Sequence, residues 1–434
     1  PLALTVQGEG PLQNLDVQLA LDADGQRTLA GSAQLRGQPE GLGFNVNLGG
    51  PISTLIPAQY RGFFGADPRL QAAGVSRDAG GLLLSSLTLS SAALQLEAAA
   101  ETAADGFLTN LSLDATIADP SNQAVLLPVA GGDTTLQSAK LTATYGEAGS
   151  EAWRVDLDVA DLRTSSFAAR DTSLEINGQA RNLQDPANRQ ITYALSGGLT
   201  GITAEDEAIQ EALGDSINLS SRGGWKSGQP LSLGQLELAA HSFVARLSGD
   251  VQDLAFNGKI ALEAADIAPF SELGGRDVSG GLTLAADGEL RPISGAFNLV
   301  LDGTGSELRI GEPAADNLLE GTTRLTGRVA RTTQGFEAEN FRIANEQLEL
   351  DANGTFSTEA ADFQFDAAVS DLALLSERAS GRLTATGTAK GRASDLKIDF
   401  VAEAPQGKLL DRNLTQARLG FDGRMQQGNL NGRV

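Results

Sequence analysis

The chain has 434 residues, and 55 Asp and Glu outnumber 32 Lys and Arg to give a net charge of −23. This excess of negative charge argues against binding to nucleic acid or to an anionic lipid surface, since both require clustered Lys and Arg. With no Cys and a single His, disulfides, thiolate chemistry and a zinc site are excluded. No apolar run of about 18 residues predicts a membrane-spanning helix.

Apolar and polar residues alternate from the beginning of the chain, where Leu2, Leu4 and Val6 share one parity. Successive side chains of a strand point to opposite faces, so each such segment predicts a strand with one apolar and one polar face. Few aromatic residues (5%) and many Gly (51) are typical of short strands joined by tight turns. In the first half of the chain the pattern recurs at residues 15–21, 44–48, 94–98, 111–117, 153–159, 174–176 and 191–195.

Two segments of this half predict helices. Residues 51–65 place apolar side chains, including Phe63 and Phe64, on one side of a helix that Pro57 shortens or kinks. This helix would be a lid over the apolar face or, as we prefer, a cap on a strand edge. Thr203 is placed to cap a helix over 204–213, whose first turn carries three acidic residues that suit the helix dipole.

The alternation continues through the second half of the chain, at residues 231–233, 243–247, 297–301, 348–350, 363–365 and 396–402. Asp-Gly and Asn-Gly pairs favour the positive φ angles of two-residue hairpins. We therefore predict about 30 antiparallel strands, paired in sequence order. The predicted hairpin turns are at Asp24-Gly25, Asp287-Gly288, Asp302-Gly303, Asn353-Gly354 and Asp422-Gly423.

An internal repeat supports this organisation. Asp266-Ile-Ala-Pro-Phe-Ser matches Asp371-Leu-Ala-Leu-Leu-Ser, and Gly-x-Leu-Thr follows each at 280–283 and 381–384. A one-turn helix is predicted in each copy, at 266–273 and 371–378. Unequal spacing of glycines that we assign to strand ends, with three or four short strands per interval, argues against a propeller and favours a stacked sheet. These glycines are Gly249, Gly288, Gly327, Gly354, Gly387 and Gly423.

Together these patterns predict an all-β protein: an elongated, curled antiparallel β-sheet that forms an open trough and carries a few short helices. We expect one continuous region over 1–434, with a possible subdivision into 1–200 and 215–434 around the short helix 204–213. The alternative is a packed β core, as in a sandwich or a solenoid, in which two apolar faces cover each other. The many Ala and Gly favour the trough, because a dry core requires interdigitating bulk.

The Asp-[Ile/Leu]-Ala-x-[Phe/Leu]-Ser turn, the Gly-x-Leu-Thr strand and the Leu-rich alternation with Gly breaks resemble the TamB family of AsmA-like proteins, most sharply from about Leu247 onward. This resemblance implies a periplasmic trough in a Gram-negative envelope, anchored in the inner membrane by a segment outside this sequence. It also implies a TamA-like outer-membrane barrel partner, outer-membrane protein clients and transport of phospholipid between the two membranes. This sequence would be a middle fragment of such a trough.

The expected function is non-enzymatic: the trough shields and conducts phospholipid acyl chains and supports outer-membrane protein assembly or secretion. The alternatives are a chaperone or scaffold that binds outer-membrane barrel proteins by strand addition, and an adhesin-like structural solenoid. We assign the hydrophobic groove to alternating apolar residues of the second half, namely Leu247, Leu282, Leu284, Phe297, Leu299, Leu301, Leu348, Leu350, Phe363, Phe365, Leu396, Ile398 and Phe400.

No motif predicts catalysis, a metal or a cofactor. His241 shares parity with Phe243 and is interpreted as a tolerated groove or edge residue, because no Gly-x-Ser-x-Gly elbow accompanies it. Asp22-Ala-Asp24-Gly25 resembles the start of a calcium loop but lacks the later ligands, so a hairpin turn is the better interpretation. The acidic pair Glu205 and Glu207 is interpreted as a solvated helix end.

Overall fold

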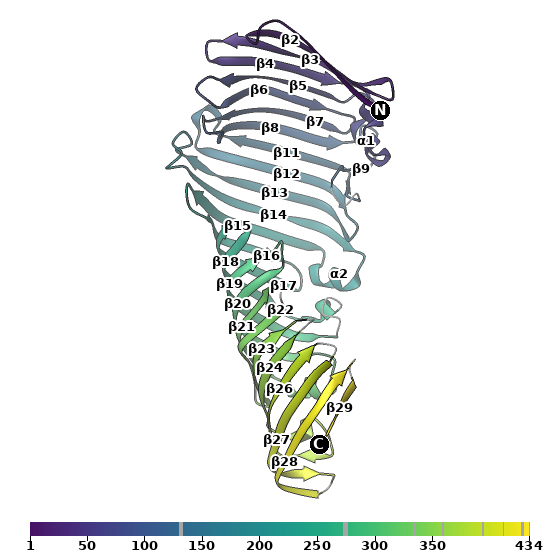
Figure 1. The fold of residues 1–434 in the computed structure, drawn as a ribbon, viewed down its shortest axis with the longest axis vertical. Coiled ribbons are helices and arrows are strands. Elements are labelled where there is room, and N and C mark those ends of the chain that lie inside the picture. The colour runs from purple at the N-terminus through teal and green to yellow at the C-terminus, as the bar shows by residue number, and fades with distance from the viewer. Residues whose placement is uncertain are drawn as a thin grey trace. The chain divides into compact units, whose positions relative to one another are not determined.

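A computed structural model describes residues 1–129, 133–271, 277–332, 335–357, 360–392, 395–410, 412–426 and 429–433. They form one open antiparallel sheet of 29 strands with a few short helices (Figure 1), at 68% strand and 8% helix. The predicted fold class is confirmed, and the sandwich and solenoid alternatives are not observed. Contacts divide the chain into an N-terminal unit, Pro1–Asp206 with Gly214–Gly234, and a C-terminal unit, Glu207–Leu213 with Gln235–Val434.

The N-terminal unit contains fifteen strands and the beginning of a sixteenth, β16, which crosses the boundary between the units. Its strands are β1 (Leu2–Glu9), β2 (Asn14–Ala23), β3 (Gln26–Gln38), β4 (Gly41–Gly49), β5 (Arg69–Arg77), β6 (Leu82–Ser90), β7 (Leu94–Thr102), β8 (Leu108–Ala118), β9 (Val125–Leu126), β10 (Thr135–Leu136), β11 (Ser138–Tyr145), β12 (Ala152–Arg163), β13 (Phe167–Arg181), β14 (Gln190–Ala204), β15 (Ser216–Lys226) and β16 (Leu231–Ala239). Its helices are η1 (Ile52–Thr54), η2 (Ala58–Tyr60), α1 (Arg61–Phe64) and η3 (Glu147–Gly149).

The C-terminal unit contains the remaining strands and, like the N-terminal unit, four short helices among the described residues. Its strands are β17 (Phe243–Gln252), β18 (Ala255–Ala264), β19 (Ser279–Arg291), β20 (Ala296–Arg309), β21 (Thr322–Thr332), β22 (Gly335–Ala344), β23 (Leu348–Phe356), β24 (Ala361–Val369), β25 (Ala379–Ser380), β26 (Leu383–Arg392), β27 (Asp395–Leu409), β28 (Arg412–Gln426) and β29 (Asn429–Arg433). Its helices are α2 (Glu207–Leu213), η4 (Ala268–Phe270), α4 (Pro313–Leu318) and η5 (Leu372–Leu374).

The strand register of the N-terminal unit aligns apolar residues of one parity into continuous rows. We call the face that carries them the apolar face. Bulges shift the register at a few places, for example between Leu21 and Asp22 and between Ala73 and Gly74. Away from these bulges the pairings keep residues of one face opposite one another, so a row can run unbroken across the sheet. One row consists of Val6, Leu19, Gly31, Leu48, Leu70, Leu89, Leu96, Ala115, Leu141, Leu157, Leu174, Gly197 and Leu219.

The C-terminal unit has an apolar face of the same construction. Bulges shift the register between β19 and β20, between β21 and β22 and between β22 and β23. In β22 the apolar face therefore passes from Phe336 and Ala338 to Phe341 and Ile343, and the pairings on both sides of the shift keep apolar residues on one face. The alternation in the sequence therefore reports one face in each unit. A row of this face consists of Leu262, Leu284, Gly303, Leu325, Ile343, Leu350, Ala367, Ala385, Ala402 and Leu419.

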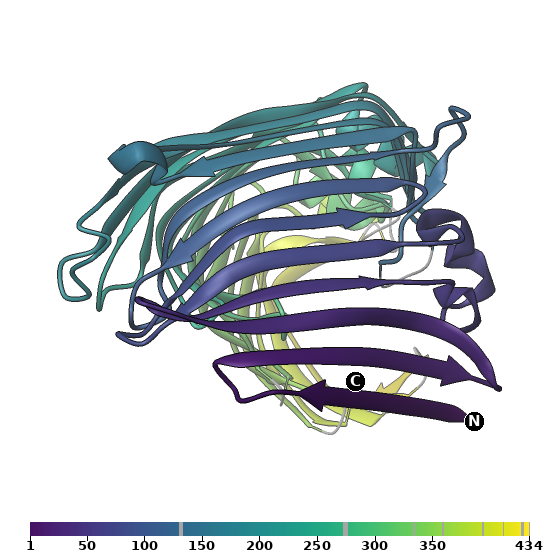
Figure 2. The ribbon, with the colours of Figure 1, turned by 90° about the horizontal axis from the view of Figure 1, so that it is seen from above.

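The N-terminal unit is curled toward its apolar face (Figure 2). The ring of Trp225, on the apolar face of β15, stacks on Phe107 with centroids 5.9 Å apart. Phe107 directly precedes β8, and β11, β12, β13 and β14 lie between β8 and β15 in the sheet. In a flat sheet β8 and β15 would be about 24 Å apart. The apolar face is therefore the inside of the bend.

The opposite, polar face carries ladders of ion pairs between neighbouring strands. Arg154 contacts Asp156 and Glu175 in the N-terminal unit, and Arg246 contacts Glu237 and Glu263 in the C-terminal unit. The arginines of these ladders are more than a third exposed, so solvent screens each pair and its contribution to stability is small. These charged side chains are thus on the polar face, which is solvated, and these ion pairs do not involve the apolar face.

Most of the predicted Asp-Gly and Asn-Gly turns are wrong. Asp24 and Gly25, with φ of 50° and 79°, do form the β2–β3 turn. The other pairs lie inside β19, β20, β23 and β28. The recurring glycines are likewise inside strands, and two strands with their turns, rather than three or four, span each interval. The register places them on the apolar face. An aromatic side chain lies across two of them: a Cβ on Gly387 would be 2.6 Å from Cζ of Phe365, and a Cβ on Gly423 would also clash with Cζ of Phe421. At the other four, a Cβ would instead meet the backbone of the neighbouring strand.

The helices form, but shorter than predicted. Residues 51–65 split into η1, η2 and α1, with a break at Pro57, and α2 begins at Glu207 because β14 continues to Ala204. The sequence predicts a possible subdivision at the helix 204–213, whereas contacts assign residues 214–234 to the N-terminal unit and α2 to the C-terminal unit. The helix α4 has no counterpart in the sequence predictions, and part of the segment 266–273 lies outside the described residues.

The internal repeat has one structural role in both copies. Oδ1 of Asp266 accepts hydrogen bonds from the backbone N–H of Ala268 and Gly280, at 2.9 and 3.0 Å. Oδ1 of Asp371 accepts the equivalent pair from Ala373 and Gly381, at 3.0 and 2.8 Å. Each carboxylate thus ties a 3-10 turn to the beginning of the following strand. These bonds lower the pKa of Asp371 below its usual value.

Candidate functional site: the apolar face

The register places all the predicted groove residues on the apolar face of the C-terminal unit. Leu396 is buried at 9% exposure, and the others are half-buried. The outward Val300, between Leu299 and Leu301, is 57% exposed. The described residues form one sheet, so no second sheet covers this face. These side chains contact one another but remain accessible from solvent. That they form a groove for a ligand stays a prediction.

One end of the apolar face in the N-terminal unit is covered. We call it the helical end, where β4, β8 and β14 finish. Phe63 of α1 is buried with Ala93, Val125 and Leu136. This cluster packs on apolar-face residues at the ends of four neighbouring strands, namely Leu94, Ile117, Ala139 and Val159. The helix therefore covers part of the apolar face, and our preference for a strand-edge cap is wrong.

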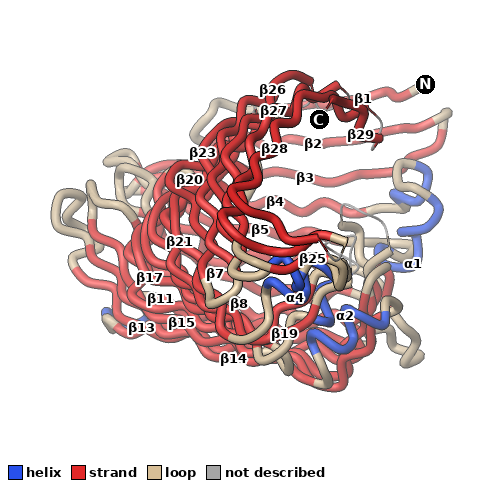
Figure 3. Tube along the Cα trace, turned by 90° about the horizontal axis from the view of Figure 1, so that it is seen from below, coloured by secondary structure: helices blue, strands red, loops and turns tan. Residues whose placement is uncertain are grey.

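The helical end of the C-terminal unit, where β18, β20 and β24 finish, carries short helices as well (Figure 3). The ring of Phe270 in η4 contacts Phe243, at the start of β17, edge-on at a centroid distance of 5.7 Å. Helix α2 contacts η4, and its Ala212 is buried. Nδ2 of Asn317 in α4 donates to the carbonyl oxygen of Leu374 in η5 at 3.0 Å. These contacts join the helical turns to one another and to the end of the apolar face.

The opposite end of the strands, the turn end, holds in the N-terminal unit an ion pair between a buried arginine and an exposed aspartate. The side chain of Arg189 is only 5% exposed. Its Nη1 and Nη2 donate to the two carboxylate oxygens of Asp105 at 2.6 and 2.9 Å, and its Nε donates to the carbonyl of Leu183 at 2.8 Å. Its guanidinium carbon lies 4.1 Å from the centroid of Phe107, which stacks on Trp225. We call Asp105, Phe107, Arg189 and Trp225 the clasp.

The clasp alters the protonation of its members. The hydrogen bonds from Arg189 lower the pKa of Asp105 to about 2. Burial raises the pKa of the nearby Tyr145, and the guanidinium of Arg189 offsets part of that increase. The hydroxyl oxygen of Tyr145 is buried and has no hydrogen-bond partner among the described atoms. The clasp thus remains a closed, charge-neutral contact over the ordinary pH range.

The turn end of the C-terminal unit differs from the clasp. Arg331 of β21 pairs in register with Phe297 of β20 and Phe336 of β22, so all three lie on the apolar face. The ring centroids of Phe297 and Phe336 are 6.4 Å apart, and the guanidinium carbon of Arg331 is 5.5 Å from that of Phe336. Phe336 is 50% exposed, and Arg331 is exposed too. This group is open where the clasp is closed.

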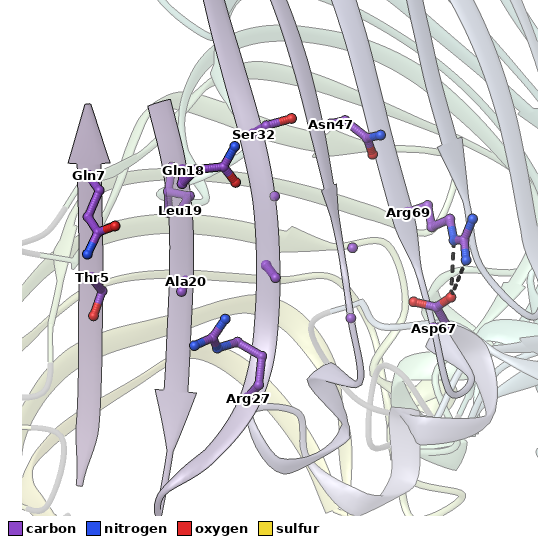
Figure 4. Close-up of a pocket in the computed structure, with 14 residues that line it drawn as sticks. Thr5, Gln7, Gln18, Leu19, Ala20, Arg27, Ser32, Asn47, Asp67 and Arg69 are labelled. Atoms are coloured by element: carbon purple, nitrogen blue, oxygen red, sulfur yellow. Dashed lines mark hydrogen bonds and ion pairs between the residues drawn. The ribbon is translucent and has the colours of Figure 1, made fainter. Parts of the chain in front are cut away.

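A polar hollow of about 700 Å³ lies over the polar face of β1 to β5 (Figure 4). It is lined mainly by short or neutral side chains, among them Thr5, Gln18 and Asn47. Its cations are neutralised locally: Arg69 binds Asp67 at 2.7 Å, and Arg27 binds Asp22 at 2.5 Å. With no charge left to select a ligand, the hollow does not define a chemical function.

The remaining candidate sites of the sequence gain no structural support. His241 lies in the β16–β17 turn, exposed, and its backbone N–H donates to the carbonyl of Leu213 at 3.2 Å, so its assignment to a strand parity is wrong. Asp24 and Gly25 form a hairpin turn directly after Asp22 and Ala23, which end β2, as expected. Among the described residues, no group of three or more His, Cys, Asp or Glu is arranged to hold a metal. No described helix has the length and apolar composition needed to span a membrane.

The sequence analysis missed both arginines of the turn ends, although a signal was present. Arg189 shares parity with Ile191 and Tyr193, and Arg331 shares parity with Leu325 and Val329. A cation in the apolar parity of a strand is unusual, because its burial is costly without a partner.

In comparisons with protein families, with curated proteins and with solved structures, the chain has no significant match.

Proposed function

We propose that the protein is not an enzyme and that its apolar face shields and conducts the acyl chains of phospholipids. The observation that carries the proposal is the unbroken apolar row in each unit, most of whose side chains are half-buried rather than covered. An apolar surface this extensive favours an apolar partner over water. Each acyl CH2 removed from water would contribute about 0.8 kcal/mol to binding.

The composition of the rows suits movement as well as binding. Leu, Ala, Gly and Phe follow one another across the strands, so neighbouring positions would hold an acyl chain with similar affinity. A chain could then pass from strand to strand without any covalent step. In the N-terminal unit, the helices at the helical end and the clasp at the turn end would confine it to the rows that cross the middle of the strands.

The cellular setting of this proposal derives from the resemblance to the TamB family. Under it, the protein acts in the periplasm, anchored in the inner membrane, and carries phospholipid between inner and outer membranes. A TamA-like outer-membrane barrel is the proposed partner, and outer-membrane proteins are the proposed clients. The solvated, acidic polar face is compatible with an aqueous compartment but does not identify it.

Photo-crosslinking tests which molecule occupies the apolar face. We expect probes at Leu299, Leu350 and Phe365 to form lipid adducts in cells, whereas a probe at the outward Val300 forms none. Adducts with protein alone, at outward positions and strand edges, would instead support the scaffold that adds client strands.

The double variant Leu299→Glu/Leu350→Glu tests conduction. Both carboxylates would lie on the apolar face, so lipid transfer between vesicles should fall at least about tenfold, because burying a charge against acyl chains is strongly unfavourable. Val300→Glu is the matched control and should leave transfer unchanged. Circular dichroism establishes that all variants retain the sheet. Undiminished transfer by the folded double variant would contradict the proposed function.

A further inference from the structure

The apolar face of the C-terminal unit carries an unneutralised cation. Arg331 lies one register step from Phe297 and from Phe336, and two residues from Val329. Arg324, Arg328 and Arg342 of the same strand pair have the opposite parity, and each of these makes an ion pair on the polar face. Arg331 makes no ion pair with any residue that the structure describes. It therefore places a positive charge beside apolar side chains without a counter-charge.

The clasp shows what a paired arginine at a turn end looks like. Arg189 has its own carboxylate, Asp105, bound through two hydrogen bonds, and its side chain is almost fully buried. Arg331 has a comparable aromatic neighbour but an exposed guanidinium and a half-exposed ring. Its planar fork is free to bind a carboxylate or a phosphate through two parallel N–H···O bonds.

An amphiphile has a polar group and an apolar tail, and apolar side chains next to Arg331 provide a surface for the tail. Leading away from it along β21, Val329 and Leu325 lie on the apolar face, with Leu299 and Leu301 beside them on β20. From Arg331 to Leu325 the strand covers about 20 Å. A ligand with its anionic group at Arg331 would have this length of apolar surface for its tail. Polar ends at the turn end and tails on the rows would then share one orientation.

We propose that Arg331, flanked by Phe297 and Phe336, is a head-group site: it binds the phosphate or carboxylate of an anionic amphiphile whose tail lies on the adjacent rows. This inference rests on the proposed function, because it assumes that the apolar face binds acyl chains. It adds a charge preference and an orientation to that binding. Neutral amphiphiles occupy the same rows without the contact to Arg331.

Binding to the whole chain tests this site with three probes: dodecyl phosphate, the neutral dodecyl maltoside, both below their micelle concentrations, and inorganic phosphate. We expect dodecyl phosphate to bind about tenfold more tightly than the maltoside at low salt, because charge-assisted hydrogen bonds add to the same tail contacts. Arg331→Gln should abolish that preference and leave the affinity for the maltoside unchanged. The preference of the unmodified protein should decrease as salt is added.

Arg324→Gln is the matched control, since Arg324 lies on the same strand but pairs with Asp302 on the polar face. It should retain the tenfold preference. Equal binding of both amphiphiles, or a preference that survives Arg331→Gln, overturns the head-group site alone. If neither dodecyl phosphate nor dodecyl maltoside binds, the proposed function itself is contradicted. Inorganic phosphate is the third probe. If it binds with the same affinity as dodecyl phosphate, and if that binding is lost in Arg331→Gln, the site is one for free phosphate and the inference is overturned.

Discussion

The two units carry the same kind of apolar face but treat its turn end differently. In the N-terminal unit, Arg189 is buried, paired with Asp105 and held against Phe107. In the C-terminal unit, Arg331 is exposed and has no ion pair among the described residues, and its neighbour Phe336 is half-exposed. The first arrangement satisfies its own charge and stabilises a bend. The second leaves charge and apolar surface available to a ligand.

This difference separates stability from binding within one chain. Residues of the clasp should contribute to folding and contribute little to ligand selection. Arg331 should do the reverse, because removing it from an exposed site leaves no buried group unsatisfied. The comparison would be wrong if a clasp substitution changed ligand selection without changing stability, or if a substitution of Arg331 destabilised the fold.

The largest effect on folding is expected for Asp105→Asn. The amide preserves the size of the side chain but leaves the buried guanidinium of Arg189 without the carboxylate that it hydrogen-bonds, and only the more distant Asp185 still offsets its charge, so the substitution is destabilising. The thermal midpoint of the N-terminal unit should fall by several degrees, and amide exchange in residues 182–189 should accelerate. Asp302→Asn, which removes an exposed partner of Arg324, is the control and should change neither quantity. An unchanged midpoint in Asp105→Asn would show that the clasp does not stabilise the bend.

The same pair determines an acid dependence. Arg189 lowers the pKa of Asp105 to about 2 in the folded protein, whereas the pKa of an Asp in an unfolded chain is about 3.9. The stabilisation is therefore fully present above about pH 4 and is lost as the pH falls toward about 2. In Asp105→Asn this part of the pH dependence should be absent. A slope that is identical in both proteins would assign the acid lability to other carboxylates.

A smaller effect is expected where both units share a device, an aromatic ring lying over a glycine of the next strand. In Gly387→Ala the new Cβ would lie 2.6 Å from Cζ of Phe365 and 2.7 Å from Cβ of Phe400. The overpacking should lower the free energy of unfolding by about 1–3 kcal/mol. Gly420→Ala is the control, because a Cβ there meets no atom within 4 Å. Equal denaturation midpoints for both variants would mean that these glycines are not required by packing.

The smallest effect is expected beside the clasp. The hydroxyl of Tyr145 is buried without a hydrogen bond, so Tyr145→Phe should leave the unfolding free energy unchanged or raise it by up to about 1 kcal/mol. Tyr193→Phe should lower it by about 1 kcal/mol, since the hydroxyl of Tyr193 bonds to Oγ of Ser221 at 3.2 Å. Chemical denaturation of both variants measures the difference. A loss of stability in Tyr145→Phe would indicate an ordered water at that hydroxyl.

The sequence predicted the strands and the faces well, because parity is a local property. Leu299 and Leu350 were assigned to the apolar face from their own segments alone, and the register agrees. Turns were predicted less well. Asp302-Gly303 has the composition of a hairpin turn, but Gly303 is selected by the side chain of Leu284 on the next strand, which no local pattern reveals.

The ion pair of the clasp could not be predicted from the sequence. Asp105 and Arg189 meet because the sheet between them bends, and the bend results from twist and packing accumulated over several strands. The position of Arg331 on the apolar face could have been predicted, because it has the same parity as Val329. The outcome for α1 depended on a similar long-range contact, between Phe63 and the ends of strands far along the chain.

The pairing order also has a consequence for how the chain acquires its structure. Most strands bind the strand before and the strand after them in sequence, so each hairpin can form as soon as its own residues are available. The hydrogen bonds of the clasp instead join residues 84 positions apart. They can close only after the intervening strands have assembled. Formation of the Asp105–Arg189 pair would therefore be a late event in folding, and the stacking of Trp225 on Phe107 would be its fluorescent reporter.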